Sequence, residues 1–301
     1  KTVMKKTLLV TMDFYPAVGG VSTYWVSLSK YLPSSQWVVL APPLGKGVEE
    51  LTAPYRIYRK QFFTRFFFPR WLPLVFHIFA VCRREYIEHI IVGQILPVGT
   101  AVRMLSRIMG ISYSVSTHGM DVTLPRRRKK GLCRWILRGA KRVFTISAYT
   151  ATHLENLGVP KDRIAFGYPC PAITPVFYRD TDENLHFRTA KHILLTVGRL
   201  VKRKGHEDVI RALPDLLKEF PDLMYGIIGE GEERDAIAKT INELELNHRV
   251  YLLGNLDNEK TAWWYQHCSI CIMTPKDFLV LLSVLFSGGI KIKFKSLRKF
   301  S

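Results

Sequence analysis

Short apolar runs alternate along the chain with segments whose apolar residues recur at helical spacing. The runs predict nine strands, at residues 8–12, 37–41, 89–92, 112–117, 143–146, 192–197, 223–228, 249–253 and 269–273. Two of the helices predicted between them are marked by Val21, Trp25, Leu28 and Leu32 and by Val209, Leu213, Leu216, Leu217 and Phe220. Strands that alternate with helices in this way are typical of parallel sheets built from βαβ units.

A proline-rich stretch, residues 168–175, separates the two halves of this pattern and contains Pro169, Pro171 and Pro175. Prolines at this density interrupt regular structure and favour a linker. We therefore predict an α/β protein of two Rossmann-like, doubly wound domains, residues 1–172 and 173–301. Two such domains that face each other across a cleft place a ligand at the carboxyl ends of both sheets.

Charge is distributed unevenly along the chain. The 301 residues are 48% hydrophobic and 23% charged, which argues against a disordered, collagen-like or coiled-coil protein. The net charge is +19, and residues 1–150 carry +17 of it. Cations interleave with aromatic residues between Arg56 and Trp71, and five more cations stand at 126–130. Such a surface suits an anionic membrane. A basic cleft for a soluble polysaccharide and a nucleic-acid site are the alternatives.

Five scattered cysteines imply no disulfide framework. Cys268 and Cys271 have a spacing found in metal and redox motifs. Residues three apart on a strand point to opposite faces, however, so we predict core packing for both and no metal site. No apolar run approaches the roughly 18–20 residues of a membrane span, and the first run lacks a small-residue cleavage site. These features predict a cytoplasmic protein that binds, if at all, peripherally to the cytoplasmic face of a membrane.

Two glycine-containing segments of the first half follow predicted strands and therefore lie at the carboxyl edge of a sheet. Gly19 and Gly20 open the first helix, where backbone N–H groups can approach a phosphate or a sugar; a tight turn is the structural alternative. The segment His118-Gly119-Met120-Asp121 follows the strand at 112–117. Its histidine can hydrogen-bond a sugar hydroxyl, and an ordinary loop histidine is the alternative.

The second half has two more such segments. Arg199 and Lys204 follow the strand at 192–197 and are bounded by Gly198 and Gly205. A planar guanidinium and a compact ammonium together suit a diphosphate, whereas a solvated loop is the alternative. Gly229-Glu230-Gly231 ends the strand at 223–228 and permits the close approach of a ligand.

Taken in order, these motifs resemble those of the family 4 retaining glycosyltransferases, the glycosyl transferases group 1, which have the GT-B fold. The matching segments are Gly19-Gly20-Val21, His118-Gly119-x-Asp121, Ile146-Ser147-Ala148-Tyr149, Gly198-Arg199-x4-Lys204-Gly205, Gly229-Glu230-Gly231 and the stretch 249–254. The resemblance runs from about Lys6 to Lys276. Each motif is weak alone, and five in the family's order are specific.

The resemblance implies a role for each matching residue. His118 would contact the transferred sugar, and Asp121 would support the loop of His118. Arg199 and Lys204 would hold the donor diphosphate and complete the catalytic set. The remaining donor-binding residues would be Gly19 and Gly20 on the acceptor and phosphate side, and Gly229, Glu230, Gly231, Leu253 and Gly254 beside the nucleotide base.

Members of the family transfer a hexose from a UDP- or GDP-sugar with retention of configuration, and they need no metal or other cofactor. The acceptor implied is a glycan or a lipid-linked molecule of cell-surface polysaccharide or glycolipid synthesis. Two fixed cations and helix N-termini can stabilise the departing diphosphate in place of a metal. A sugar-nucleotide epimerase of the same architecture and a basic nucleic-acid-binding protein are the competing interpretations. No nucleic-acid-binding motif is present, so we expect no nucleic-acid partner.

The sequence departs from the family pattern after Asp277. Family members continue with a Glu-Gly-Phe-Gly segment that carries two glutamates eight positions apart and opens a helix. Residues 279–301 contain no Asp or Glu. We therefore expect a truncated, incomplete second domain and impaired transferase activity. The uncharged run at 278–286 also predicts aggregation.

Overall fold

The computed structural model describes residues 4–17, 19–66, 68–123, 129–168 and 190–274. Contacts between Cα positions divide the chain into two units, Lys1–Ile173 and Thr174–Ser301. The predicted boundary between residues 172 and 173 lies outside the described residues, as do nearly all of the proline-rich stretch and the whole segment after residue 274.

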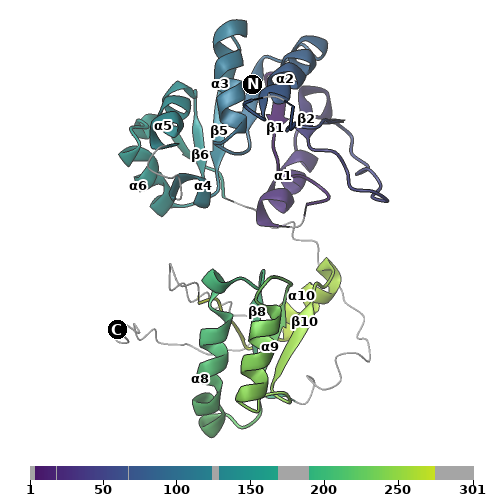
Figure 1. The fold of residues 1–301 in the computed structure, drawn as a ribbon, viewed down its shortest axis with the longest axis vertical. Helices are drawn as coiled ribbons and strands as arrows, with labels where there is room; N and C mark the ends of the chain where they lie inside the picture. Colours follow the sequence, from purple (N-terminus) through teal and green to yellow (C-terminus); the bar gives the residue numbers. More distant parts are fainter. Residues whose placement is uncertain (1–3, 18, 67, 124–128, 169–189, 275–301) are drawn as a thin grey trace. The chain divides into compact units, whose positions relative to one another are not determined.

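The described part of the first unit forms a parallel sheet of seven strands in the order β3-β2-β1-β4-β5-β6-β7 (Figure 1). The strands are β1 (Thr7–Val10), β2 (Trp37–Ala41), β3 (Arg56–Arg59), β4 (His89–Val92), β5 (Ser112–Thr117), β6 (Val143–Thr145) and β7 (Ile164–Phe166). The helices are α1 (Gly20–Lys30), α2 (Leu72–Arg84), α3 (Val98–Met109), α4 (Met120–Thr123), α5 (Lys130–Gly139) and α6 (Ala148–Asn156), with short 3-10 turns at Ser34–Gln36 and Lys161–Arg163. Strand order reverses between β1 and β4, which pair directly.

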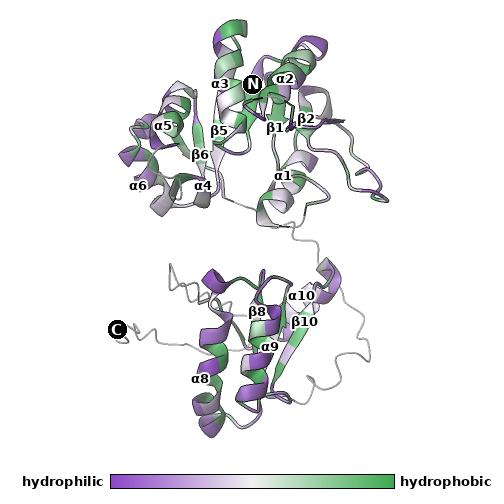
Figure 2. Ribbon diagram, in the orientation of Figure 1, coloured by the Kyte–Doolittle hydropathy of each residue, from purple (hydrophilic) through white to green (hydrophobic). Residues whose placement is uncertain are grey.

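Both faces of this sheet are covered. Leu8 and Val10 of β1 belong to a core cluster with buried residues of α2, α3 and α5, whereas Leu9 packs with Trp25 of α1 in a second cluster. Because successive residues of a strand point to opposite faces, an uninterrupted apolar strand supplies both cores. Figure 2 shows apolar residues along the strands and polar residues on the outer sides of the helices.

The described part of the second unit is a parallel sheet of four strands in the order β10-β9-β8-β11. Its elements are β8 (His192–Val197), a 3-10 turn (Lys202–Lys204), α8 (His206–Glu219), β9 (Leu223–Ile228), α9 (Arg234–Glu243), β10 (Val250–Gly254), α10 (Asn258–His267) and β11 (Ile270–Cys271). Leu194 of β8 packs with α8 and α9 on one face, and Leu195 packs with Trp263 and Trp264 of α10 on the other. This unit is therefore also doubly wound.

All nine predicted strands are present, with ends that differ by up to two residues, and both predicted helices correspond to α1 and α8. Two strands were not predicted from the sequence, β3 and β7, which are the edge strands of the first sheet. The sequence of β3 is Arg-Ile-Tyr-Arg, and only three residues form β7. Arginines at both ends of β3 interrupt its pattern, and β7 is apolar (Ile-Ala-Phe) but only three residues long, so neither segment has the longer apolar run that marks a central strand.

The prediction of core packing for Cys268 and Cys271 is confirmed, but the reason given for it is wrong. Each cysteine is 7% exposed, and both belong to the same core cluster. Cys268 lies at the C-cap of α10 and only Cys271 lies in β11, so the alternation of a strand does not apply to the pair. Burial raises the pKa of both thiols, which is typical of packed, unreactive cysteines.

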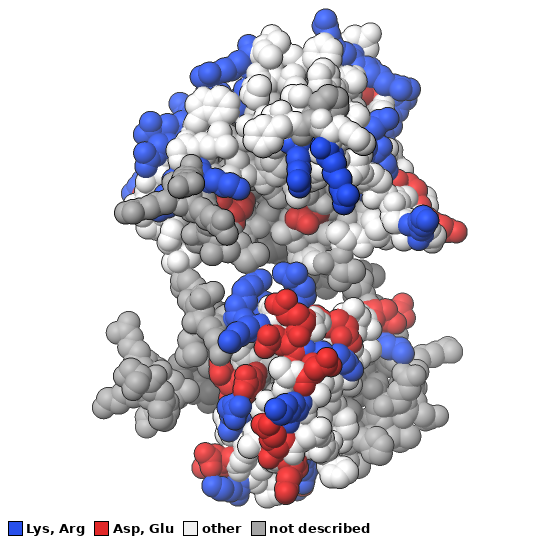
Figure 3. Space-filling model, in the orientation of Figure 1, with Lys and Arg blue, Asp and Glu red and all other residues white. Residues whose placement is uncertain are grey.

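The two units also differ in surface charge. Figure 3 shows many Lys and Arg side chains and few Asp or Glu side chains over the visible face of the first unit, and a mixture of both signs over the second. The uneven charge of the sequence is therefore a property of the folded surface. Within the described ranges, no helix combines the length and the apolar character needed to cross a bilayer.

Candidate active site

In each unit the candidate residues lie at the carboxyl edge of the sheet, near the point where strand order reverses. The reversal falls between β1 and β4 in the first sheet and between β8 and β11 in the second. Chain connections leave such a point in opposite directions, and doubly wound folds bind their ligands there.

Gln94 joins the loops that follow β1 and β4. Its Nε2 donates to Thr11 Oγ1 (3.0 Å) and to Asp13 Oδ2 (2.9 Å), and its Oε1 accepts from the Met12 N–H (2.9 Å). One side chain thus holds the loop that carries Asp13. Gln94 was not predicted from the sequence, although a polar residue just beyond an apolar strand was an available signal.

His118 follows β5 and packs against α1. Its ring lies edge-on to Tyr24 and Trp25, with ring centroids 5.5 Å and 6.0 Å away, and its Nε2 lies 3.4 Å from Ser116 Oγ. Burial lowers the pKa of His118 to about 4, although the nearby carboxylate of Asp13 raises it. The imidazole is therefore neutral at pH 7 and has one donor nitrogen and one acceptor nitrogen for a hydroxyl.

Asp121 holds the loop of His118 through a single oxygen. Its Oδ1 accepts a hydrogen bond from the His118 N–H at 3.1 Å. The other oxygen, Oδ2, is buried and has no partner among the described residues. Burial raises the pKa of Asp121 to about 6, although backbone hydrogen bonds from the same loop lower it.

Gly19 and Gly20 are exposed and begin α1. Within the described chain no side chain caps this helix, and a Cβ added at either glycine would meet nothing within 4 Å. The start of α6, in comparison, has a side-chain N-cap, because Ser147 Oγ accepts a hydrogen bond from the Thr150 N–H at 3.2 Å. The first N–H groups of α1 are therefore open to approach.

Backbone hydrogen bonds join the glycine loops of the second unit into one continuous edge. The Leu200 N–H donates to the Glu230 carbonyl (3.0 Å), and the Gly229 N–H donates to the Gly254 carbonyl (2.8 Å). Close packing explains the glycines of this edge, since a Cβ at Gly229 or Gly231 would collide with the carbonyl of the loop after β8. The tertiary structure thus accounts for these two glycines even without a ligand.

Arg199 and Lys204 lie in that loop after β8, and no carboxylate in the described parts of the chain forms an ion pair with either. Arg199 is exposed and Lys204 is half-buried. Burial lowers the pKa of Lys204, and the charges of Arg203 and Arg199 lower it further. Cations without a partner at this edge are available to bind an anion.

The residues expected beside the nucleotide base are placed differently from one another. Glu230 Oε1 accepts from Arg234 Nη1 at 2.7 Å, so this carboxylate already has a partner. The side chain of Leu253 packs inward, with Cδ1 3.4 Å from the position of a Cβ added at Gly226. Leu253 can therefore reach this edge only through its backbone, together with Gly254. In the ranges that the structure covers, no cluster of three or more His, Cys, Asp or Glu side chains could hold a metal ion.

Two family models match the chain. The model of Glycosyltransferase Family 4 matches residues 18–169, which is more than half of the chain. This chain belongs to glycosyltransferase family 4. The model of Glycosyl transferases group 1 matches residues 178–277 of the same family 4 chain, and that match ends where the sequence departs from the family pattern.

Several curated proteins are similar to this family 4 chain. The GDP-mannose-dependent alpha-(1-6)-phosphatidylinositol monomannoside mannosyltransferase of Mycolicibacterium smegmatis is 28% identical over 262 residues, which cover 82% of this chain and 67% of that protein. One subunit of the phosphatidylinositol N-acetylglucosaminyltransferase of Homo sapiens is 27% identical over 277 residues, which cover 83% of this chain and 53% of that protein.

Solved structures establish the fold. The sucrose-phosphate synthase of Thermosynechococcus elongatus has a TM-score of 0.72 at 22% identity, covering 89% of this chain and 75% of that one. Anabaena HepE in complex with UDP and glucose has a TM-score of 0.70 at 17% identity, covering 90% and 74%. The predicted α/β, GT-B fold is confirmed.

Proposed function

We propose that this family 4 chain transfers a hexose from a UDP- or GDP-sugar to a lipid-linked or glycan acceptor, with retention of configuration and without a metal. The observation that carries the proposal is the pair Arg199 and Lys204, two cations without carboxylate partners among the described residues at the carboxyl edge of the second sheet. The names of the similar proteins, which include GDP-mannose and phosphatidylinositol, support a nucleotide-sugar donor and a glycolipid acceptor.

The proposed chemistry uses the two cations to stabilise the leaving group. When the bond between the anomeric carbon and the diphosphate oxygen breaks, the electron pair stays on the diphosphate and positive charge develops on the sugar ring. Arg199 and Lys204 hold the diphosphate and stabilise its charge. The oxygen of the acceptor hydroxyl forms a bond to the anomeric carbon on the face from which the diphosphate leaves, and its proton passes to the departing diphosphate oxygen, so configuration is retained. His118 contacts the sugar, and Asp121 holds its loop.

Binding of UDP and GDP tests the proposed diphosphate site. Replacing Arg199 or Lys204 with Ala removes a charge-assisted contact, and we expect isothermal titration calorimetry to show affinity reduced by about ten- to a hundredfold. Lys202→Ala is the matched control, because Lys202 is an exposed cation of the same turn. Equal affinities of Arg199→Ala, Lys204→Ala and the control would place the diphosphate elsewhere.

A graft of the family's Glu-Gly-Phe-Gly segment tests its effect on the rate of sugar transfer. We propose that the activity of this sequence is impaired, because residues 279–301 lack the two glutamates of the family pattern. A Glu-Gly-Phe-Gly segment from a family member, grafted after Asp277, is expected to raise the rate of sugar transfer from UDP- or GDP-sugars. Equal rates with and without the graft would show that the segment is not needed.

We also propose that the first unit binds an anionic membrane through an aromatic surface formed by the loop before α2 and the outer face of α2. Phe66 and Phe68 in the loop are 92% and 96% exposed, and α2 buries Leu74 while exposing Phe76. The complete aromatic surface consists of Phe63, Phe66, Phe68, Phe76 and Phe79 with Arg65, Arg70, Arg83 and Arg84. Exposed phenylalanines flanked by arginines suit an anionic lipid interface.

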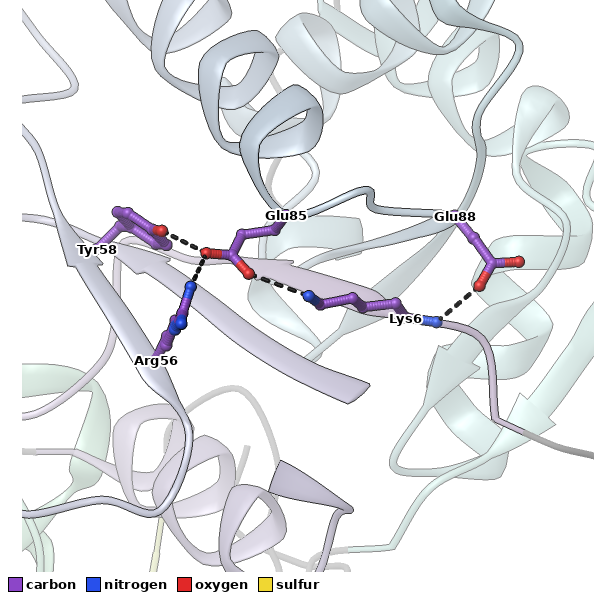
Figure 4. Close-up of polar contacts among 5 residues, drawn as sticks. All are labelled: Lys6, Arg56, Tyr58, Glu85 and Glu88. Atoms are coloured by element: carbon purple, nitrogen blue, oxygen red, sulfur yellow. Dashed lines mark hydrogen bonds and ion pairs between the residues drawn. The ribbon is translucent and has the colours of Figure 1, made fainter. Parts of the chain in front are cut away.

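The surface that we propose is smaller than the one expected from the sequence. Arg56 is exposed, but it is ion-paired with the buried carboxylate of Glu85, as Figure 4 shows, so we do not include it in the proposed aromatic surface. Residues 126–128 lie outside the described part of the chain. We expect replacement of Phe66 and Phe68 with Ser to reduce flotation with phosphatidylserine vesicles, whereas the control Tyr31→Ser, at a residue 78% exposed on the same unit, keeps it. Equal flotation with neutral vesicles would contradict the proposal, and salt-sensitive binding to duplex DNA would favour the nucleic-acid alternative.

A further inference from the structure

His206 is a buried residue of the second unit whose hydrogen bonding is incomplete. It is the first residue of α8 and is only 3% exposed. Its Nε2 lies 3.1 Å from the carbonyl oxygen of Arg199. A carbonyl oxygen only accepts, so Nε2 carries the proton and Nδ1 carries a lone pair. That Nδ1 is buried and has no partner among the described residues.

Stability alone does not explain this histidine. A buried polar atom without a partner is unfavourable, and a leucine would fill the same space without one. The Arg199 carbonyl already accepts a second hydrogen bond from the Val201 N–H at 2.9 Å, so it does not need His206 to be satisfied. An unsatisfied buried group that persists in this way points to a role in the loop it contacts.

The bond from His206 closes the loop that carries both cations. It ties the start of α8 back to Arg199, while the Lys204 N–H donates to the Val201 carbonyl at 2.9 Å inside the loop. The end of the loop is held as well, because Thr274 Oγ1 donates to the Gly205 carbonyl at 2.9 Å. The backbone of Arg199 is therefore fixed relative to Lys204 by a buried side chain.

We infer that His206 is a positioning residue for the diphosphate site: its Nε2–H holds the Arg199 backbone so that the guanidinium and the Lys204 ammonium bind the same anion. This inference rests on the proposed role of Arg199. A contact that fixes the loop before the ligand binds lowers the entropic cost of ordering that loop on binding. The sequence places His206 beside Gly205, but it does not show which carbonyl the ring contacts.

The test compares two replacements of His206 in the full chain. His206→Leu removes the donor, whereas His206→Gln keeps an amide N–H that reaches toward the position of Nε2. His192→Leu is the matched control, because His192 is exposed and lies at the start of β8, at the opposite edge of the sheet. The readouts are calorimetric affinities for UDP and for GDP and the midpoint of thermal unfolding.

We expect His206→Leu to weaken binding of UDP or GDP about five- to tenfold, the effect of losing one hydrogen bond. His206→Gln restores most of the affinity, His192→Leu keeps it, and all unfolding midpoints stay within about 2 °C of the parent. A His206→Leu protein that binds as tightly as the parent overturns the inference. So does one that loses stability and affinity together without rescue by Gln.

The Arg199→Ala variant separates this inference from the proposed function. If Arg199→Ala weakens binding and His206→Leu does not, the positioning inference is wrong and the diphosphate site stands. If Arg199→Ala leaves the affinities unchanged, or the parent chain binds neither nucleotide at millimolar concentration, the proposed diphosphate site is wrong and the positioning inference falls with it.

Discussion

Two carboxylates at opposite edges of the first sheet, the buried Glu85 and the half-buried Asp121, have pKa values shifted in opposite directions. At the amino edge, Glu85 accepts hydrogen bonds from Lys6 Nζ (3.0 Å), Arg56 Nη1 (2.7 Å) and Tyr58 Oη (2.5 Å), as Figure 4 shows. Burial by itself raises the pKa of Glu85, but these three donors outweigh it and lower the pKa to about 2. At the carboxyl edge, Asp121 has no cation partner among the described residues, and burial raises its pKa to about 6.

The opposite directions of the two pKa shifts follow from the partners of each carboxylate. Glu85, at the C-cap of α2, joins this helix to Lys6, the residue before β1, and to β3, and its charge is paired inside the fold. Asp121 leaves one oxygen unpaired, and in the second unit Arg199 and Lys204 likewise lack carboxylate partners within the described ranges. The amino edge is thus built for stability, whereas the carboxyl edges keep polar groups available, as a binding site requires.

The largest effect is expected at Glu85. Glu85→Gln leaves Lys6 and Arg56 without their buried counter-charge, and we expect it to lower the free energy of unfolding by about 2–3 kcal/mol. Urea unfolding at pH 7 measures the change, with Glu88→Gln as control, because Glu88 is exposed and accepts one bond from the Lys6 N–H. A lowered pKa stabilises the fold above the ordinary value of 4.5, so the difference between Glu85→Gln and the parent should disappear as the pH falls from about 4.5 toward 2. Equal losses in the two variants would contradict the role of Glu85.

Ionisation of Asp121 should destabilise the fold, whereas ionisation of Glu85 stabilises it. A raised pKa means that the folded state favours the protonated acid, so ionisation of Asp121 destabilises the fold as the pH rises through about 6. Asp121→Asn keeps an oxygen for the His118 N–H, and we expect it to raise the free energy of unfolding by about 1–2 kcal/mol at pH 8 and by almost nothing at pH 4. Thermal unfolding at the two pH values measures this, with Asp162→Asn as the control, because Asp162 is an exposed carboxylate in the turn Lys161–Arg163 of the same unit. A loss of stability at pH 8 would show that the Asp121 charge has a partner.

The smallest effect concerns His118. Its lowered pKa means that the neutral ring stabilises the fold above about pH 6.5 and that this stabilisation is lost as the pH falls through about 4. Asp13→Asn removes the negative charge that raises the pKa of His118, so the pKa should fall by a few tenths of a unit. NMR titration of the ring protons measures the shift, again with Asp162→Asn as control. An unchanged or higher pKa would mean that Asp13 does not act on the imidazole.

Much of the fold could be predicted because the central strands are continuous apolar runs. Residues such as Leu8 and Leu9 face different cores, so every position of β1 must be apolar or small, and the run is visible in the sequence. The edge strand Arg56–Arg59 could not be found in this way, since its outer residues face solvent. The argument for opposite faces failed for Cys268 and Cys271 because Cys268 is the C-cap of α10 and lies outside β11, which the sequence pattern does not show.

The candidate site was predicted where its residues directly follow a strand. Arg199 and His118 stand at strand ends, and in parallel sheets those ends meet at one edge. Gln94 and the contacts of His118 with Tyr24 and Trp25 were missed, because no local pattern tells which side chains will meet across that edge. In the sequence, His206 stands out only as the residue after Gly205.

Which segments form the central strands, where glycines and cations interrupt them and how unevenly the charge is divided can all be read from the chain alone. These are local properties, set by the periodicity of side chains along the backbone. Packing, in contrast, settles which charged groups are paired. Glu85 meets donors that are 79, 29 and 27 residues away in the chain, while Asp121 meets none of that kind among the described residues. A carboxylate becomes a strong or a weak acid through the groups that packing brings to it, and that depends on strand order and register rather than on its neighbours in the sequence.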